Sequence, residues 1–163
     1  MQKITPCLWY DNQAEEATRF YTSIFKNSKI VETTYYSELG PGQPGSVMVV
    51  NFQLEGQDFI ALNGGPVFQF TPAISLSVDC KSQAEVDELW EKLTLGGEES
   101  QCGWLTDRFG VSWQIVPSEL VEMLNDKDPE KASRVTAAMF QMKKLDIAAA
   151  RRAYEGLEPV TSQ

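Results

Sequence analysis

Hydrophobic and polar positions follow the same order twice along this chain. Residues 5–25 and residues 71–95 each begin with an apolar run, continue through a polar stretch, and end with apolar residues at helical spacing. The helical apolar positions are Ala14, Ala17, Phe20, Tyr21, Ile24 and Phe25 in the first copy and Val86, Leu89, Trp90 and Leu93 in the second. A duplication of this kind predicts two copies of one supersecondary unit, each with an amphipathic helix that packs on a sheet.

Polar residues indicate where the two helices begin. Asn12 and Ser82 are favourable N-cap residues, and Glu15 and Glu85 follow them by three positions, as in a capping box. Gly96-Gly97 is expected to end the second helix. Each copy therefore predicts a strand followed by a capped helix.

Period-two alternation follows each helix and predicts strands. The expected strands are residues 30–36, 47–54 and 59–62 in the first copy, and residues 98–101, 102–107 and 111–116 in the second. Each copy is then a βαβββ unit. The sequence predicts an α+β fold in which two βαβββ modules form a cupped mixed sheet with the helices outside, followed by a C-terminal helical tail.

The pattern changes after Pro117. Val135, Met139 and Met142 fit one helix face, and Asp146 can cap a second helix, so the tail is expected to be a pair of helices. This Met-rich stripe could cover a sheet edge, line a pocket or dock on a second subunit. No linker divides the chain, which predicts a single domain of residues 1–163, with module one at 1–68, module two at 69–117 and the tail at 118–163. We expect a two-fold homodimer, the commonest soluble assembly.

The composition limits the classes of molecule that this protein is expected to bind. The chain has 14 basic and 23 acidic residues and a net charge of −9, which disfavours nucleic acid and anionic membranes as partners. No apolar run approaches the roughly 20 residues that span a bilayer, and no signal peptide opens the chain. Three cysteines without a C-x-x-C spacing indicate reduced thiols. We therefore expect a cytoplasmic protein.

Histidine is absent from the chain. Its absence excludes Ser-His-Asp and Cys-His catalysis, histidine general-base chemistry and most transition-metal sites. The acidic residues fall mainly in caps, turns and solvent-facing helical positions, and no pair of carboxylates indicates a catalytic dyad.

Three segments resemble a known family. Residues 5–11 (TPCLWYD), residues 14–21 and above all residues 102–117 (CGWLTDRFGVSWQIVP) resemble the PhnB-like branch of the vicinal oxygen chelate superfamily. That superfamily includes glyoxalase I, extradiol dioxygenases and bleomycin resistance proteins, and the branch often carries the label 3-demethylubiquinone-9 3-methyltransferase. The resemblance covers roughly residues 3–155, tail included.

The resemblance implies metal ligands that this chain does not carry. The positions that hold the metal in other members fall near residues 5–7, Ala61, Ala73 and Gln114. A hydroxyl or thiol, two alanines and one amide cannot make a tight divalent-ion site, so we expect no metal. We also expect no cofactor, because Gly64-Gly65-Pro66 follows a strand without opening a helix, unlike the glycine-rich turns that hold S-adenosylmethionine or dinucleotides.

Strand alternation predicts which residues line the cup. The expected ligand-binding cavity consists of Cys7, Trp9, Phe59, Ala61, Asn63, Ser75, Ser77, Trp104, Ser112 and Gln114. Small polar groups among aromatic rings suit a mostly apolar, partly polar small molecule. In the alternative interpretation, these serines and the glutamine satisfy one another around trapped water.

Two functions of different classes fit this sequence. The first is a metal-free binding protein for a small hydrophobic or aromatic metabolite, as the resemblance to bleomycin resistance proteins implies. The second is an enzyme of the same superfamily, such as a lyase, an isomerase, a dioxygenase-like enzyme or the methyltransferase of the family label, acting on a small oxygenated substrate. The sequence favours binding, because no acid, base or nucleophile assembles from it.

Overall fold

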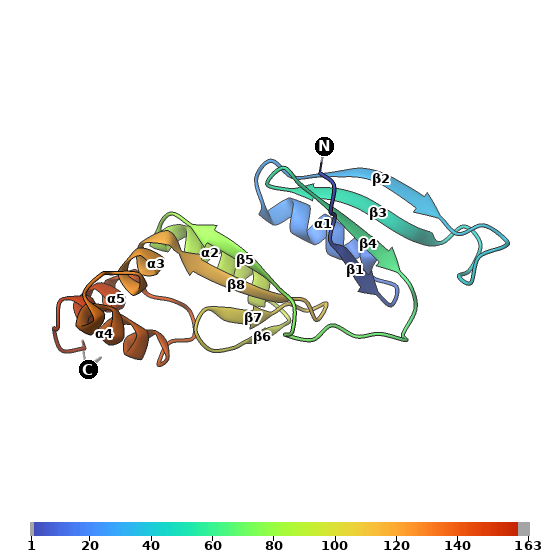
Figure 1. Ribbon diagram of the computed structural model, residues 1–163. Coiled ribbons are helices and arrows are strands. Elements are labelled where there is room, and N and C mark those ends of the chain that lie inside the picture. The colour runs from blue at the N-terminus through green and yellow to red at the C-terminus, as the bar shows by residue number, and fades with distance from the viewer. Residues whose placement is uncertain (1, 160–163) are drawn as a thin grey trace. The chain divides into compact units, whose positions relative to one another are not determined.

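Two units make up the described part of the chain, residues 2–159 of the computed structural model (Figure 1). They divide between Phe70 and Thr71, so module one forms the first unit and module two, with the tail, forms the second. No helix within residues 2–159 is long and apolar enough to cross a membrane.

Module one is a four-stranded sheet with one helix. Its elements are β1 (Cys7–Tyr10), α1 (Ala14–Ile24), β2 (Lys29–Tyr35), β3 (Val47–Leu54) and β4 (Gln57–Asn63). The strands lie in the order β1-β4-β3-β2, with β1 parallel to β4 and the other neighbours antiparallel. Helix α1 packs on one face of this sheet, chiefly against β3 and β4.

Module two repeats this arrangement. Its elements are β5 (Ser75–Cys80), α2 (Gln83–Thr94), β6 (Glu98–Glu99), β7 (Trp104–Thr106) and β8 (Ser112–Pro117), in the sheet order β5-β8-β7-β6. β5 is parallel to β8, as β1 is to β4, and α2 packs on β8 and β7. The predicted βαβββ duplication and the α+β class are confirmed.

The tail consists of three helices rather than the expected pair. They are α3 (Ser118–Leu124), α4 (Pro129–Met139) and α5 (Ile147–Tyr154). Helix α3 was not predicted because it has only seven residues, follows β8 directly and has no side-chain cap. Asp146 does cap the last helix, accepting a hydrogen bond from the backbone N–H of Ala149 at 3.0 Å.

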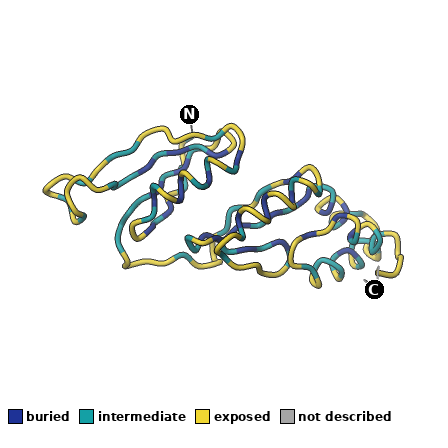
Figure 2. Tube along the Cα trace, turned by 180° about the vertical axis from the view of Figure 1, so that it is seen from behind, coloured by how far each residue is buried: buried dark blue, intermediate teal, exposed yellow. Residues whose placement is uncertain are grey.

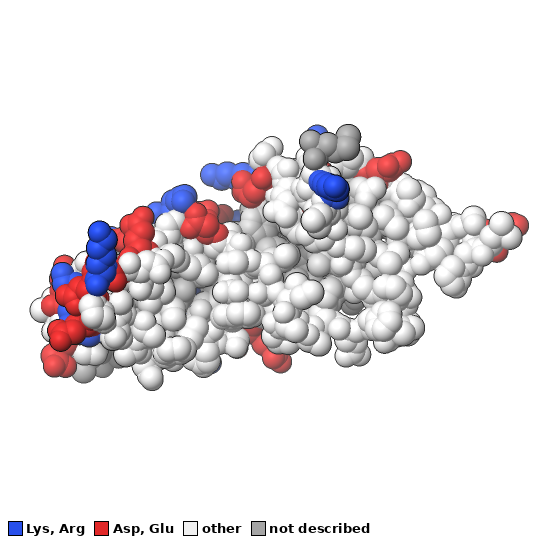
Figure 3. All heavy atoms as spheres, viewed as in Figure 1, with Lys and Arg blue, Asp and Glu red and all other residues white. Residues whose placement is uncertain are grey.

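The tail has a small hydrophobic core of its own. Leu120, Met123, Val135, Leu145 and Ala150 are buried there, with Met139 and Met142 packed against them. The Met-rich stripe that the sequence offered for several roles therefore covers this core. In Figure 3, charged side chains gather over the tail helices, and the pairs Arg151–Glu119 and Lys144–Asp87 are among the tail's contacts.

The cap of α2 forms as predicted, but the cap of α1 does not. Ser82 Oγ accepts a hydrogen bond from the backbone N–H of Glu85 at 3.1 Å. At α1 the N-cap position falls on Gln13, which makes no side-chain capping bond, so the assignment of Asn12 was wrong. The first helical N–H, that of Ala14, donates instead to Asn63 Oδ1 of β4 at 2.8 Å.

The core of each module lies between its helix and its sheet, where Figure 2 shows the buried stretches. In module one, Tyr21 of α1 stacks on Phe52 of β3, which in turn stacks on Phe59 of β4. In module two, all four predicted helix positions are buried: Val86, Leu89, Trp90 and Leu93. Each sheet therefore has one helix-covered face and one face turned away from its helix, which we call the open face.

Candidate functional site

The open face of module two carries the predicted residues of that module. Trp113 and Ile115 of β8 and Leu105 of β7 are buried on the α2 side. Because strand residues alternate and paired residues share a face, the opposite face holds the remaining positions. These are Ser75, Ser77, Trp104, Ser112 and Gln114, as expected from the sequence.

A hydrogen bond joins two side chains at the centre of this face. Gln114 Nε2 donates to Ser75 Oγ at 3.0 Å across the parallel β5–β8 pair. The hydroxyl hydrogen of Ser75 and the Oε1 atom of Gln114 then remain as one donor and one acceptor. Trp104 lies directly opposite Gln114 in the β7–β8 pair and is half-buried. An aromatic ring and a polar pair therefore stand side by side.

The open face of module one differs from the prediction. Cys7 and Trp9 point away from α1, as expected, because their neighbours Leu8 and Tyr10 are buried on the helix side. The β1–β4 register pairs Leu8 with Ala61 and Tyr10 with Asn63.

Three predicted residues of β4 therefore lie on the helix face, and their expected orientation was wrong. Ala61 is buried, Phe59 stacks on Phe52 of the core, and Asn63 caps α1. Ile60 and Leu62, which pair with Cys7 and Trp9, take the open face instead. The open face of module one is thus more apolar than the predicted set.

The loop after β4 folds over Trp9. Trp9 Nε1 donates to the carbonyl oxygen of Gly65 at 2.9 Å, and Phe68 meets the indole edge-on with ring centroids 5.0 Å apart. A Cβ at Gly64 would come within 2.3 Å of the Trp9 ring, so only glycine fits there. Trp9 is therefore held in one position, with part of its ring covered by its own module.

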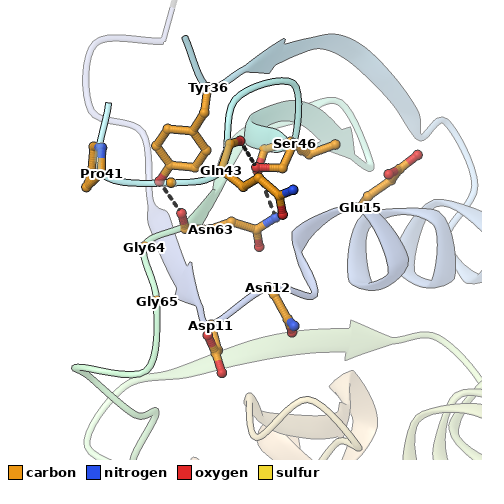
Figure 4. Close-up of a pocket in the computed structure, with 12 residues that line it drawn as sticks. Asp11, Asn12, Glu15, Tyr36, Pro41, Gln43, Ser46, Asn63, Gly64 and Gly65 are labelled. Atoms are coloured by element: carbon orange, nitrogen blue, oxygen red, sulfur yellow. Dashed lines mark hydrogen bonds between the residues drawn. The ribbon is translucent and has the colours of Figure 1, made fainter. Parts of the chain in front are cut away.

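A separate cavity of about 430 Å³ lies in module one beside the start of α1 (Figure 4). Asn63 holds its walls together: Oδ1 accepts from Ala14 N, Nδ2 donates to Val47 O at 3.1 Å, and its carbonyl oxygen accepts from the Tyr36 hydroxyl. Gly42 lies against the Tyr36 ring, where a Cβ would approach within 2.4 Å. Among the ten predicted cavity residues, Asn63 is the one that lines this cavity.

The lining of this cavity combines acidic, amide and apolar groups. Asp11 and Glu15 contribute carboxylates, while Ser46 Oγ donates its hydrogen to the carbonyl oxygen of Gln43. The Tyr36 hydroxyl hydrogen is likewise used by a carbonyl, while the side-chain amides of Asn12 and Gln43 bring donors as well as acceptors. The two carboxylates disfavour a large apolar ligand at this site.

Neither Cys80 nor Cys7 is activated as a nucleophile. Burial raises the pKa of Cys80 to about 12, with the nearby carboxylates of Glu85 and Asp79 adding to the effect. Desolvation also raises the pKa of Cys7 above its usual value. Both thiols therefore stay protonated near neutral pH, whereas nucleophilic and metal-binding cysteines act as thiolates.

The fold and its two open faces define a class of protein, the vicinal oxygen chelate superfamily. Within it, the chain belongs to the 3-demethylubiquinone-9 3-methyltransferase family, whose model matches residues 2–116. The match ends within β8, so the tail, which the sequence resemblance had included, lies outside it. None of the curated proteins matches this chain.

Solved structures agree with this assignment. A putative 3-demethylubiquinone-9 3-methyltransferase, PhnB protein, from Bacillus cereus is 40% identical, with a TM-score of 0.67 over 72% of this chain and 100% of its own. Protein PA1353 from Pseudomonas aeruginosa is 20% identical, with a TM-score of 0.60 over 72% and 98%. The fosfomycin resistance protein FosX from Listeria monocytogenes is 19% identical, with a TM-score of 0.58 over 77% and 98%. The last two support the fold alone.

The residues of this chain do not fit the divalent metal of the superfamily. FosX has been crystallised with Mn(II). Within residues 2–159, no three His, Cys, Asp or Glu side chains are grouped so that they could hold a metal ion. The residues near the implied positions are Cys7, whose thiol is protonated, the two alanines Ala61 and Ala73, and Gln114, whose amide is already bonded to Ser75. This donor set is too weak for Mn²⁺ or Zn²⁺.

Proposed function

We propose that this protein binds a small, mostly apolar or aromatic molecule on its open sheet faces and does so without a tightly held metal ion. The observation that carries the proposal is the grouping of Trp104, Gln114 and Ser75 on one face of module two. A half-buried indole supplies an apolar surface for a ring. The Ser75 hydroxyl and Gln114 Oε1 supply a donor and an acceptor for an oxygenated substituent.

The two open faces support this ligand class better than the cavity of Figure 4 does. That cavity is lined by the carboxylates of Asp11 and Glu15, which are costly to desolvate beside an apolar molecule. The open face of module one instead presents Trp9, Ile60 and Leu62. Apolar surface with a few polar groups is the usual composition of small-molecule sites.

The family name suggests methyl transfer from S-adenosylmethionine. The described residues do not form the glycine-rich turn between a strand and a helix that usually binds this cofactor. Gly64 and Gly65 follow β4 but lead through residues 66–74 to β5, with no helix between. The pairs β1–β4 and β5–β8 are the parallel pairs within two small mixed sheets, unlike the parallel sheets that hold such cofactors. The enzymatic alternative therefore lacks a supporting observation, and binding is the better proposal.

The same proposal includes a cytoplasmic location and a homodimer. The three cysteines are free thiols, which fits a reducing compartment. A homodimer would close the apolar open faces against water, and two-fold pairing is the commonest way to do so. Light scattering at micromolar concentration tests the assembly, and a monomeric mass would refute it.

A thermal-shift screen tests the binding proposal. The protein would be stripped of metal with EDTA, analysed for bound metal, and heated with quinones, phenols and 2-oxo compounds. A ligand at about 100 times its Kd should stabilise the native state by about 2.7 kcal/mol and raise Tm by several degrees. The variant Gln114→Ala should lose this shift, while Lys92→Ala, on the far side of α2, should keep it. If no compound of these classes raises Tm, the proposal fails.

A further inference from the structure

The helical tail contacts module two at one tight turn. The turn joins β6 to β7, and its two central residues, Cys102 and Gly103, have φ angles of 59° and 82°. A two-residue turn with positive φ at both positions leaves its apex N–H groups without partners inside the hairpin. Here both groups have partners in the tail.

Backbone carbonyls of the tail accept both hydrogen bonds. Cys102 N donates to Met142 O at 2.8 Å, and Gly103 N donates to Lys143 O at 2.8 Å. The carbonyl oxygen of Gly103 accepts from Ile115 N of β8, also at 2.8 Å. The turn is thus fixed on one side by the sheet and on the other by the segment between α4 and α5.

Side-chain packing reinforces this contact. Leu145 is buried in the tail core and lies so close to Gly103 that a Cβ there would come within 2.8 Å of it. The next residue after this glycine is Trp104, the aromatic residue of the proposed binding face. The turn is therefore adjacent to the backbone of Trp104, which the β7–β8 pairing also holds.

We propose that the tail is a positioning element for the binding face: residues 142–145 hold the Cys102–Gly103 turn and so fix Trp104 beside Gln114. The family match ends at residue 116, so this part of the chain is an addition to the shared fold that acts on its binding face. The effect on ligand affinity rests on the proposed function. The effect on Trp104 itself does not, because it follows from the contacts alone.

Substitutions on helix α2 can weaken the contact between residues 142–145 and the turn without changing the binding face. Gln83 Nε2 donates to Leu145 O at 3.0 Å, and Gln83 Oε1 accepts from Ile147 N at 2.8 Å. Lys144 pairs with Asp87 at 2.8 Å on the same helix. Removing the Gln83 amide takes two hydrogen bonds from the tail segment, each worth about 1 kcal/mol.

Tryptophan fluorescence tests the positioning role. In a Trp9→Phe background, the remaining half-buried tryptophan is Trp104, since Trp90 and Trp113 are buried. Acrylamide quenching would be measured for Gln83→Ala, for Gln83→Ala with Lys144→Ala, and for the control Lys92→Ala, which removes an exposed pair with Glu88 on the same helix. Far-UV circular dichroism checks that all variants are folded.

If residues 142–145 hold the turn, the acrylamide quenching constant should rise about twofold in Gln83→Ala and more in the double variant. The reason is that the tail segment opens locally more often when two of its hydrogen bonds are lost. The constant should not rise in Lys92→Ala. Equal quenching in all folded variants would overturn the positioning role.

Titration with menadione, in protein that retains Trp9, adds the functional readout. If the parent binds menadione, Gln83→Ala should weaken binding severalfold, and an unchanged affinity would refute the link to the binding face. If the parent does not bind menadione, the quinone ligand class of the proposed function fails, while the quenching result still decides the positioning role.

Discussion

Asp107 offers the sharpest test of how the hairpin of module two is held. Its carboxylate is 2% exposed and lies in the turn between β7 and β8. Oδ1 accepts from Phe109 N at 2.8 Å and from Val111 N at 3.0 Å, and Oδ2 accepts from Trp113 Nε1 at 2.9 Å. The change Asp107→Asn keeps the shape of this group but replaces one acceptor with an NH₂ donor.

The cost follows from that replacement. If the remaining oxygen keeps the two backbone bonds, the new NH₂ group faces the indole N–H of Trp113, donor against donor. A bond to a charged acceptor is worth about 1.5–3 kcal/mol, and a buried donor left without a partner costs about 1–3 kcal/mol. We therefore expect Asp107→Asn to lower the free energy of unfolding by about 3 kcal/mol. With a urea m-value of about 2–3 kcal/mol/M, the midpoint should fall by about 1 M.

A double-mutant cycle with Trp113→Phe isolates the interaction. Phenylalanine removes the indole N–H, so the amide of Asp107→Asn no longer faces a donor, and the two losses should be less than additive. We expect a coupling of about 1–2 kcal/mol, measured by urea unfolding followed by circular dichroism. A coupling below about 0.5 kcal/mol would refute the reasoning, because the Asp107–Trp113 bond would then add little to stability.

Further predictions concern the cap, the turn and the thiols. Asn63→Ala should lower the free energy of unfolding by about 2 kcal/mol through loss of the α1 cap and of the bond to Val47 O, while Asn12→Ala should leave it unchanged, and the reverse order in urea unfolding would contradict the observed cap. Gly103→Ala should destabilise by about 2 kcal/mol or more, because its positive φ and the nearby Leu145 leave no room for a Cβ; an unchanged urea midpoint would show that the turn tolerates one. Cys80, with its pKa raised to about 12, should resist Ellman's reagent at pH 8 in the folded protein while Cys7 reacts, and its modification at the rate of an unfolded control would be inconsistent with burial.

Local signals in the sequence were enough to predict the helix of module two and the two faces of β8. Ser82 caps α2 from three residues away, and the alternation around Trp113 assigns the two faces of β8 correctly. Both features depend on neighbours in the chain. The start of α1 could not be predicted in this way, because its cap comes from Asn63, which is 49 residues from Ala14 in sequence.

The faces of β4 were misassigned for a related reason. The run Phe59-Ile60-Ala61-Leu62 is apolar on both faces, so period-two alternation separates the residues into two sets without saying which set meets the helix. The pairing with β1 and the stacking of Phe59 on the core decide it. Such pairing depends on tertiary packing, which a pattern along one strand does not contain.

Calorimetric titration in the presence of EDTA tests the central claim most directly. The best compound of the thermal-shift screen would be titrated into the parent protein and into Gln114→Ala and Trp104→Ala. We predict saturable binding that is the same with and without EDTA and that weakens about tenfold or more in both variants, a loss of about 1.4 kcal/mol or more. Binding that appears only after Mn²⁺ is added, or that neither variant weakens, would contradict a metal-free site on the open face of module two.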